Sequence, residues 1–380
     1  MAISGKEKAN YYFDHYTIDN GLSQNTVTTI FQDSKGFMWF GTKNGLNRFD
    51  GYTFKVFSRG TQPHTLGNSS IYCIAKDSDN NLWIGTDVGA YIYNPHIDSF
   101  SFFDKELPSG GSLSYDISKI VFFQNQIWFK TGFDLFIYDP TKGFIHSELL
   151  RQLKALTRHT PSDVITDGQT IWLSIPRYGI VKYDGIRFTT LYNDSDFPTS
   201  KILVKNNKVY IGTSNKGLII LDLIKDQTRQ LDLPTTDQEN PLIHCLVEID
   251  NQIWIGTENG IYIVTNGDIT NIQHRQNDPY SLSNNAVYAI FQDQDKGIWI
   301  GSYFGGIDYA PRHKLNFEKY YPYSGKNSIS GFRIREICQD KKGNLWIATE
   351  DAGLNHYDTH TNTFTTYSQH TPGIQLSYYN

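Results

Sequence analysis

Three short stretches of the chain carry residue types that could bind a sugar-like or acidic ligand. Most of its recurring polar turns hold small side chains, as in residues 43–45 and 258–260. The dipeptides Arg177-Tyr178 and Tyr303-Phe304 replace two of these turns, and Arg333 with Arg335 lies where the last repeat begins. Aromatic faces stack on sugar rings, and arginine binds carboxylate or sulfate through paired hydrogen bonds. The same residue types also mark protein interfaces or simply pack, so we treat them as candidate ligand-binding residues.

No catalytic or metal-binding set stands out in the sequence. The 11 histidines have no ligand spacing, and a strand-and-turn context separates His356 from His360. Residues 293–297 look like a calcium loop, but Lys296 interrupts them and no distal glutamate follows, so a hairpin turn is the better interpretation. Gly-x-Ser-x-Gly and phosphate-cradling glycine loops are absent. We therefore expect no catalytic residue, no metal and no cofactor in this segment.

The elements that would position these residues repeat along the chain. An aromatic residue followed by an apolar residue and, in most cases, glycine recurs about every 44 residues. All 7 tryptophans of the chain occupy this position. The eight anchors are Trp39, Trp83, Trp128, Trp172, Tyr210, Trp254, Trp299 and Trp346. Because they recur in every repeat, we interpret the tryptophans as core or inter-repeat packing and not as sugar platforms.

One repeat contains four short strand signals. In the second repeat, residues 70–75, 82–86, 90–93 and 99–103 are rich in aromatic and β-branched residues and are separated by turn clusters. Four strands per period of about 44 residues predict a blade of a β-propeller. The glycine after most anchors, such as Gly41, indicates close approach of a neighbouring strand or blade. Helical periodicity appears only in residues 148–154.

Eight repeats allow two arrangements of an all-β propeller of four-stranded blades. Residues 11–18 resemble an isolated fourth strand that could pair with the last blade and close a ring. Repeats one to seven, residues 11–324, would then form one propeller, and residues 325–380 would begin a second one. Alternatively, all eight repeats close a single ring. Residues 373–380 resemble the opening of a ninth repeat, so we expect the sequence to stop within a longer protein.

Composition excludes several functions. The net charge of -5 argues against a nucleic-acid partner and against a polybasic membrane surface. Residues 1–10 lack the apolar core of a signal peptide, and no run of 18 apolar residues predicts a membrane helix. Cys73, Cys245 and Cys338 each lie in the strand before an anchor, where we expect buried free thiols.

The repeat resembles that of a known family. Residues 21–27 (GLSQNTV), 31–39 (FQDSKGFMW) and 40–49 (FGTKNGLNRF) look like the two-component-regulator propeller repeat, and residues 280–301 look similar, whereas repeats three to five diverge. In that family two seven-bladed propellers and a β-sandwich precede a membrane span, a histidine kinase and a response regulator. The resemblance implies the periplasmic sensor ectodomain of a Bacteroidetes hybrid two-component system. It also favours the seven-bladed arrangement.

The resemblance implies recognition without catalysis in this segment, although a full-length family protein would carry histidine kinase activity. The expected partner is an oligosaccharide or glycan fragment, and we expect a homodimer in the full-length receptor. Membrane tethering would then come only from regions absent from this chain. A scaffold propeller that binds a protein is the alternative. A third possibility, based on a resemblance to streptogramin-lyase propellers, is a lyase-like enzyme.

Overall fold

The computed structural model describes residues 11–60, 64–107, 110–145, 148–235, 239–276, 278–312, 319–322, 327–368 and 371–372. Eight four-stranded antiparallel sheets dominate it, which confirms the predicted all-β propeller class. The suggested start of a ninth repeat, residues 373–380, lies outside the described residues. The chain divides into two compact units. The first comprises residues 1–274 and 282–312, and the second comprises residues 275–281 and 313–380.

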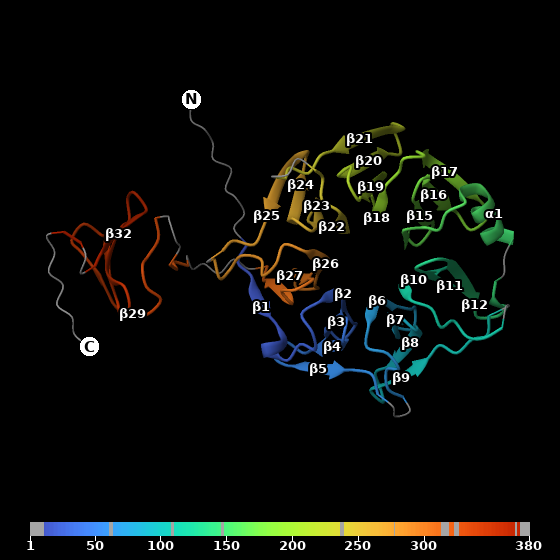
Figure 1. Cartoon of the computed structure of the whole chain (residues 1–380), viewed down its shortest axis with the longest axis horizontal. Helices are drawn as coiled ribbons and strands as arrows, with labels where there is room; N and C mark the ends of the chain where they lie inside the picture. Colours follow the sequence, from blue (N-terminus) through green and yellow to red (C-terminus); the bar gives the residue numbers. More distant parts are fainter. Residues whose placement is uncertain are drawn as a thin grey trace. The chain divides into compact units, whose positions relative to one another are not determined.

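The first unit contains seven blades, each numbered from its innermost strand outward (Figure 1). Blade one comprises β2 (Val27–Gln32), β3 (Met38–Thr42), β4 (Gly45–Phe49) and β5 (Phe54–Phe57). Blade two comprises β6 (Ile71–Lys76), β7 (Leu82–Thr86), β8 (Gly89–Asn94) and β9 (Ser99–Phe102). Blade three comprises β10 (Ile117–Phe123), β11 (Gln126–Thr131), β12 (Leu135–Asp139) and β13 (Gly143–Phe144). Blade four comprises β14 (Asp163–Thr166), β15 (Ile171–Ile175), β16 (Gly179–Tyr183) and β17 (Phe188–Asn193).

The remaining blades follow the same plan. Blade five comprises β18 (Thr199–Lys205), β19 (Lys208–Thr213), β20 (Leu218–Asp222) and β21 (Gln227–Leu231). Blade six comprises β22 (Ile243–Ile249), β23 (Gln252–Thr257), β24 (Gly260–Thr265) and β25 (Asp268–Ile272). Blade seven comprises β26 (Val287–Gln292), β27 (Ile298–Ser302) and β28 (Ile307–Ala310), with β1 (Asp14–Tyr16) as its outer strand. Helix α1 (Glu148–Thr157) connects blades three and four, and a short 3-10 turn, η1 (Ile18–Asn20), follows β1.

The seven blades of the first unit form a closed ring. Each innermost strand contacts the innermost strand of the next blade, and β26 of blade seven contacts β2 of blade one. The N-terminal strand β1 pairs with β28. Blade seven is therefore built from both ends of the ring's chain, with β1 from its start and β26 to β28 from its end. His15 of β1 lies within 2.6 Å of the fully buried Asp308 of β28. β1 therefore covers the edge of β28 that would otherwise stay unpaired at the junction of the ring.

Close packing between blades explains the glycine that follows most anchors. A Cβ atom on Gly41 would lie 2.6 Å from Cγ2 of Ile71 in the next blade, and one on Gly301 would lie 2.7 Å from Cγ1 of Val27. A side chain at these positions would separate the blades, so the predicted close approach is confirmed.

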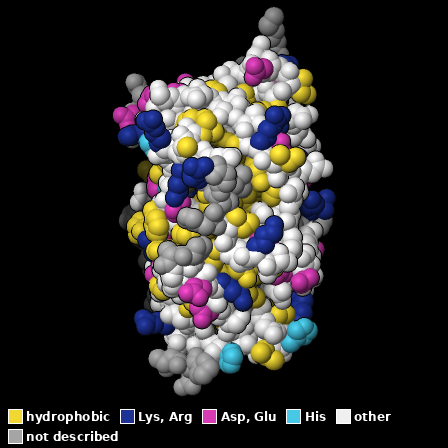
Figure 2. All heavy atoms as spheres, turned by 90° about the vertical axis from the view of Figure 1, so that its right-hand side faces the viewer, with side chains coloured by type: hydrophobic (Ala, Val, Ile, Leu, Met, Phe, Trp, Pro, Cys, Tyr) yellow, Lys and Arg dark blue, Asp and Glu magenta, His cyan; other side chains and the backbone are white. Residues whose placement is uncertain are grey.

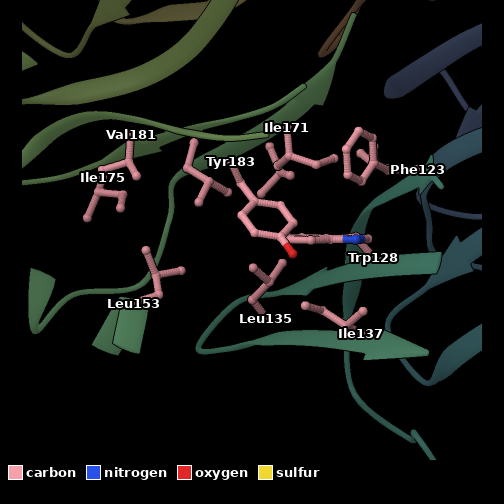
Figure 3. Packing of buried hydrophobic residues seen from close by; sticks show 12 residues of the cluster. Phe123, Trp128, Leu135, Ile137, Leu153, Ile171, Ile175, Val181 and Tyr183 are labelled. Carbon is pink, nitrogen blue, oxygen red and sulfur yellow. The ribbon is translucent and has the colours of Figure 1, made fainter. Parts of the chain in front are cut away.

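The tryptophans of the ring are packing residues, as predicted. Each of the six is at most 5% exposed. Four of them donate their indole N–H to an aspartate of the preceding turn, for example Trp39 to Asp33 at 2.8 Å and Trp299 to Asp293 at 2.7 Å. Trp128 sits in the cluster between blades three and four, beside Tyr183 (Figure 3). Its indole N–H has no partner among the described residues, because a tight turn at Gln124-Asn125 replaces the aspartate turn there.

The second unit contains blade eight, formed by β29 (Ile334–Gln339), β30 (Leu345–Thr349), β31 (Gly353–Asp358) and β32 (Thr363–Tyr367). Its innermost strand β29 is exposed along its whole length, unlike the half-buried inner strands of the ring. Cys338 is consequently exposed, which corrects the prediction of a buried thiol, whereas Cys73 is buried and Cys245 is half-buried. The prediction was wrong because it assumed that a neighbouring blade covers every inner strand. Within the described residues of this unit there is one four-stranded sheet only.

No helix among the described residues is long and apolar enough to cross a membrane. On the face over α1 and its neighbouring blades, basic and acidic side chains are interspersed and form no basic stripe (Figure 2).

Candidate functional site

One face of the ring collects two recurring positions from each blade. The first is the turn between strands two and three, and the second is the start of the inner strand of the next blade. Backbone hydrogen bonds join them: the N–H of Gly45 donates to the carbonyl of Ser69, and that of Gly306 donates to Asn25 across the ring junction at 3.0 Å. Both glycines have positive φ, at 127° and 79°. Side chains at these positions therefore meet across neighbouring blades.

A β-bulge sets the direction of the side chain at the start of most inner strands. The register shifts by one residue there in every ring blade except the fourth, and a bulge re-aims the extra side chain. The bulged residues of the ring are Thr28, Tyr72, Ser118, Ser200, His244 and Tyr288. The hydroxyls of Thr28 and Ser200 donate hydrogen bonds to backbone carbonyls of the next blade, those of Ile71 and Ile243, at 2.6 and 2.8 Å. The larger side chains at this position are Tyr72, His244 and Tyr288, and the last two contact Glu258 in the turn of blade six.

Five of these side chains form a connected group over blades six, seven and one, which we call the aromatic arc: His244, Glu258, Tyr288, Tyr303 and Lys43. Nε2 of His244 lies 2.6 Å from Oε1 of Glu258, and the Tyr288 hydroxyl donates to the same oxygen at 3.2 Å. The His244 and Tyr288 rings stack with centroids 3.9 Å apart.

The arc continues from blade seven into blade one. The ring centroids of Tyr288 and Tyr303 are 5.2 Å apart. Lys43 Nζ donates to the Tyr303 hydroxyl at 2.6 Å and lies 4.3 Å from the Tyr303 ring centroid. Phe304 packs edge-on against Tyr303 at 4.6 Å and remains 68% exposed. Three aromatic rings, the His244 imidazole and two charged groups therefore form one connected group.

The electrostatics of the arc follow from burial and from Glu258. Burial lowers the pKa of His244, and the Glu258 carboxylate opposes that shift without cancelling it. The neutral imidazole is therefore favoured. Burial, with the negative charge of Glu258, raises the pKa of Tyr288 to about 12. Tyr288 consequently stays protonated and can donate a hydrogen bond.

The predicted ligand-binding residues fall in different places. Tyr303 belongs to the arc and Phe304 adjoins it. Tyr178 packs against the core between blades three and four, and its hydroxyl lies 2.9 Å from that of Thr190. Arg177 is exposed and has a left-handed backbone, with φ of 56°.

Arg333 and Arg335 belong to the second unit. Both face the carboxylate of Glu350, Arg333 at 3.9 Å and Arg335 in direct contact. Arg335 is the bulged residue of blade eight, and Glu350 is in its turn between strands two and three. The pair thus repeats the arrangement of His244 and Glu258 in blade six.

Sequence reasoning missed His244, Glu258, Tyr288 and Lys43. In the sequence, no combination of a histidine with an acidic residue differs from ordinary turn residues. The signal was present in the repeat alignment, because His244 and Glu258 occupy the bulge and turn positions of one blade. Recognising it requires knowing that the inner strand bulges, which the residue types alone do not show.

Metal binding finds no support in the described part of the chain, where no group of three or more His, Cys, Asp or Glu side chains could hold an ion. The segment that resembles a calcium loop is a turn. Asp293 accepts hydrogen bonds from the N–H of Gly297 at 2.7 Å and from the Trp299 indole at 2.7 Å.

Comparisons with known proteins show which family the repeat resembles. Four segments match the family described as Two component regulator propeller, namely residues 21–44, 65–88, 281–304 and 329–351. A 66-residue stretch is 44% identical to histidine kinase P4 of Formosa agariphila, covering 17% of this chain and 5% of the kinase.

Solved structures resemble the whole fold. The extracellular domain of BT3049 of B. thetaiotaomicron, described as a candidate hybrid two-component system, is 25% identical with a TM-score of 0.71, over 94% of this chain and 49% of that one. The extracellular domain of BT4673 from the same organism is 23% identical with a TM-score of 0.67, over 94% and 54%. This chain therefore spans about half the length of those domains. A streptogramin B lyase shares the fold, at 15% identity and a TM-score of 0.57 over 79% of this chain and 97% of that one.

Proposed function

The chain carries two-component regulator propeller repeats, and we propose that it is the ligand-sensing part of a hybrid two-component receptor whose histidine kinase lies outside this chain. The ligand is an oligosaccharide, the sensing takes place in the periplasm, and the full-length receptor is a homodimer. The similarity to extracellular domains of two-component systems supports the sensor role.

The aromatic arc is the observation that favours a sugar ligand. Sugar rings present apolar C–H faces that stack on aromatic side chains, together with hydroxyls that need donors and acceptors at the edges. Tyr288, Tyr303 and the exposed Phe304 supply faces, while Glu258 and Lys43 supply an acceptor and a donor within the same group. Because Glu258 and Tyr288 already hold each other in place, part of the cost of ordering them is met before a ligand binds.

Signalling requires more than binding. A ligand shifts a receptor between two arrangements only by the difference in its affinity for them. The arc is built by three successive blades, so a ligand that contacts all of them favours one relative position of those blades. We propose that this preference reaches the kinase through a change in dimer geometry. A dimer whose geometry stayed the same with and without ligand would exclude this coupling.

The test is a thermal-shift screen of the chain against neutral and acidic oligosaccharides. A ligand at about 100 times its dissociation constant adds about 2.7 kcal/mol to the free energy of unfolding. Tyr303→Ala should abolish the shift for any ligand that binds the arc. Tyr52→Ala is the matched control, because Tyr52 is 92% exposed and lies in the turn between strands three and four of blade one, away from the arc. A shift unaffected by Tyr303→Ala would place the ligand elsewhere. A panel without any shift, together with capture of a specific protein, would favour the scaffold function instead.

His244 and Glu258 also support a second candidate, a lyase-like activity. A neutral histidine oriented by a carboxylate can act as a general base. It would take the proton from the ring carbon that bears the carboxyl group of a uronic acid. A double bond would then form between that carbon and its neighbour, while the bond from the neighbour to the glycosidic oxygen breaks and the oxygen leaves as a hydroxyl with a proton from water. The ultraviolet absorbance of that double bond, lost in His244→Ala, would identify the activity. Binding without any such product would leave recognition as the function.

A further inference from the structure

Blades three to five carry charged side chains where the other ring blades carry small ones. The residue after each bulge lies directly opposite the glycine position of strand two. In blades one, two, six and seven these pairs are Thr29 with Gly41, Cys73 with Gly85, Cys245 with Gly256 and Ala289 with Gly301. In blades three, four and five they are Lys119 with Lys130, Asp163 with Ser174 and Lys201 with Gly212. The inner strands of blades three to five therefore carry Lys119, Asp163 and Lys201, and Lys130 adds a third lysine from the second strand of blade three.

Lys119 and Lys130 are a like-charge pair in direct register. Side chains directly opposite each other on antiparallel strands are neighbours, and like charges there destabilise the sheet. Lys130 is also largely covered: its Nζ donates to Ser118 Oγ at 3.1 Å and to the carbonyl of Thr131 at 3.2 Å, both of which are uncharged. Burial, followed by the positive charge of Lys201, lowers the pKa of Lys130.

Asp163 does not balance the three ammonium groups. Its Oδ1 lies 3.7 Å from Lys119 Nζ, and its Oδ2 accepts the N–H of Ile202 at 3.1 Å. The carboxylate is 3% exposed and both of its oxygens are engaged. Lys201 makes no side-chain hydrogen bond or ion pair with any described residue, although its charge acts on both Lys130 and His244. Asp116, which acts on Lys130 more weakly than Asp163, is bonded to the N–H of Gly132 at 2.9 Å.

A half-buried cluster of three cations that nearby carboxylates compensate only in part costs stability in the free protein. In a chain with a net charge of -5 it does not reflect a generally basic surface. A bound anion would remove the cost, because charge-assisted hydrogen bonds to ammonium groups are stronger than neutral ones. Lys201 also joins the cluster to the His244 end of the aromatic arc electrostatically.

We propose that Lys119, Lys130 and Lys201 form a binding site for one anionic group at the first two strands of blade three and the inner strand of blade five, and that the oligosaccharide of the proposed function carries this group as a carboxylate or a sulfate. The identification of the anion as part of a sugar rests on the proposed function. The anion site itself does not.

The experiment measures the melting temperature of the full chain, and its binding affinity at constant temperature, with each of four probes. Sodium sulfate at low millimolar concentration, against sodium chloride of equal ionic strength, tests the site with a free anion. Sodium glucuronate against glucose tests a sugar-borne carboxylate. We expect saturable stabilisation by sulfate or glucuronate and none by glucose or chloride.

Three variants locate the effect. Lys201→Met should weaken anion binding by about tenfold or more, since one of three charge-assisted contacts is lost. Lys130→Gly installs the residue of blades one, two, five, six and seven, and should raise the melting temperature without anion while abolishing the anion response. Lys35→Met, at an exposed turn of blade one, should change neither and controls for net charge.

Each result separates the two proposals. The anion site would be overturned if sulfate or glucuronate bound equally well to the wild type, Lys130→Gly and Lys201→Met. It would also be overturned if no protein responded to either anion. If neutral sugars then bind in a Tyr303-dependent way, the sensor function stands without it. If instead sulfate binds through the lysines while no sugar binds, the anion site stands and the oligosaccharide function fails.

Discussion

Nε2 of His244 lies 2.6 Å from Oε1 of Glu258, although His244 is on strand β22, Glu258 is in the turn after β23, and neither stands out in the sequence. The bulge of β22 directs the imidazole to the turn that follows β23, so a local irregularity of the inner strand creates the contact. In blade eight the same two positions hold Arg335 and Glu350, which are also in contact. The repeat therefore provides a fixed pair of positions at which each blade can place complementary side chains.

The first prediction concerns the pH dependence of His244. Burial lowers its pKa below the ordinary value of 6.5, and Glu258 only partly opposes this. The unfolded chain therefore binds a proton at a higher pH than the folded chain does. The free energy of unfolding should fall as the pH drops from about 6.5 towards the folded pKa. His244→Gln should remove this component, as measured by urea denaturation between neutral and mildly acidic pH. An identical pH dependence in the variant would show that His244 does not contribute.

The second prediction concerns ring closure by β1. Asp308 is fully buried, accepts the N–H of Ser283 at 3.1 Å and contacts His15 of β1. Asn47 occupies the same position in blade one and accepts the N–H of Ser23 at 2.9 Å. Asp308→Ala removes the acceptor of the Ser283 N–H and the carboxylate that contacts His15, and should cost about 1–3 kcal/mol.

Asp308→Asn is the matched control, because it installs the residue of blade one and keeps the acceptor for Ser283. We expect it to cost less than Asp308→Ala and to lose only the charge that faces His15. Amide hydrogen exchange of β1 measures the closure directly. Equal protection of β1 in the wild type and in Asp308→Ala would contradict a role for this contact in holding the ring closed.

The architecture was predictable because the information is local and repeated. The anchor at Trp39 and its equivalents identify strand two of each blade, and Gly41 reports the approach of Ile71 from the next blade. The arc was not predictable, because Lys43 and Tyr303 are neighbours only after blade seven has closed on blade one. Nor did the pattern show that Tyr178 would pack inward while Tyr303 would not, since both replace the same turn. Whether the tyrosine packs inward depends on which side chains the neighbouring blade places next to it.

The third prediction concerns thiol reactivity. Burial raises the pKa of Cys73 and of Cys245 to about 12, so the reactive thiolate is scarce at both sites near neutral pH. Cys338 is exposed on β29. In the native protein a maleimide should therefore label Cys338 rapidly and the other two only upon unfolding, as mass spectrometry of digested samples can measure. Rapid labelling of Cys73 would show that blades two and three separate in solution. Slow labelling of Cys338 would show that another surface covers β29.

The fourth prediction concerns the arginines of the second unit. Glu350 already faces both Arg333 and Arg335 and competes with any acidic ligand for them. Exposed ion pairs contribute at most about 1 kcal/mol, so Glu350→Gln should leave stability nearly unchanged. If these arginines bind a carboxylate or sulfate, Glu350→Gln should raise the affinity for an acidic oligosaccharide, and Arg333→Ala with Arg335→Ala should lower it. Affinities that are the same in all three proteins would remove both arginines from the ligand site.

The fifth prediction tests Arg177, whose backbone has a left-handed φ of 56°. Non-glycine residues there cost roughly 1 kcal/mol, and asparagine tolerates the conformation better than arginine does. Arg177→Asn should therefore keep or slightly raise the melting temperature. If the exposed guanidinium binds an acidic ligand, the same substitution should weaken that binding by about tenfold, the loss of one charge-assisted contact. Arg177→Lys is informative beside it, because lysine keeps the charge but lacks the planar fork for bidentate contact. Weakened binding in both variants would indicate bidentate recognition, and weakened binding in Arg177→Asn alone would indicate charge. Unchanged binding in both would mean that Arg177 is a solvated turn residue, and the ligand would then be sought at the aromatic arc and the lysine cluster.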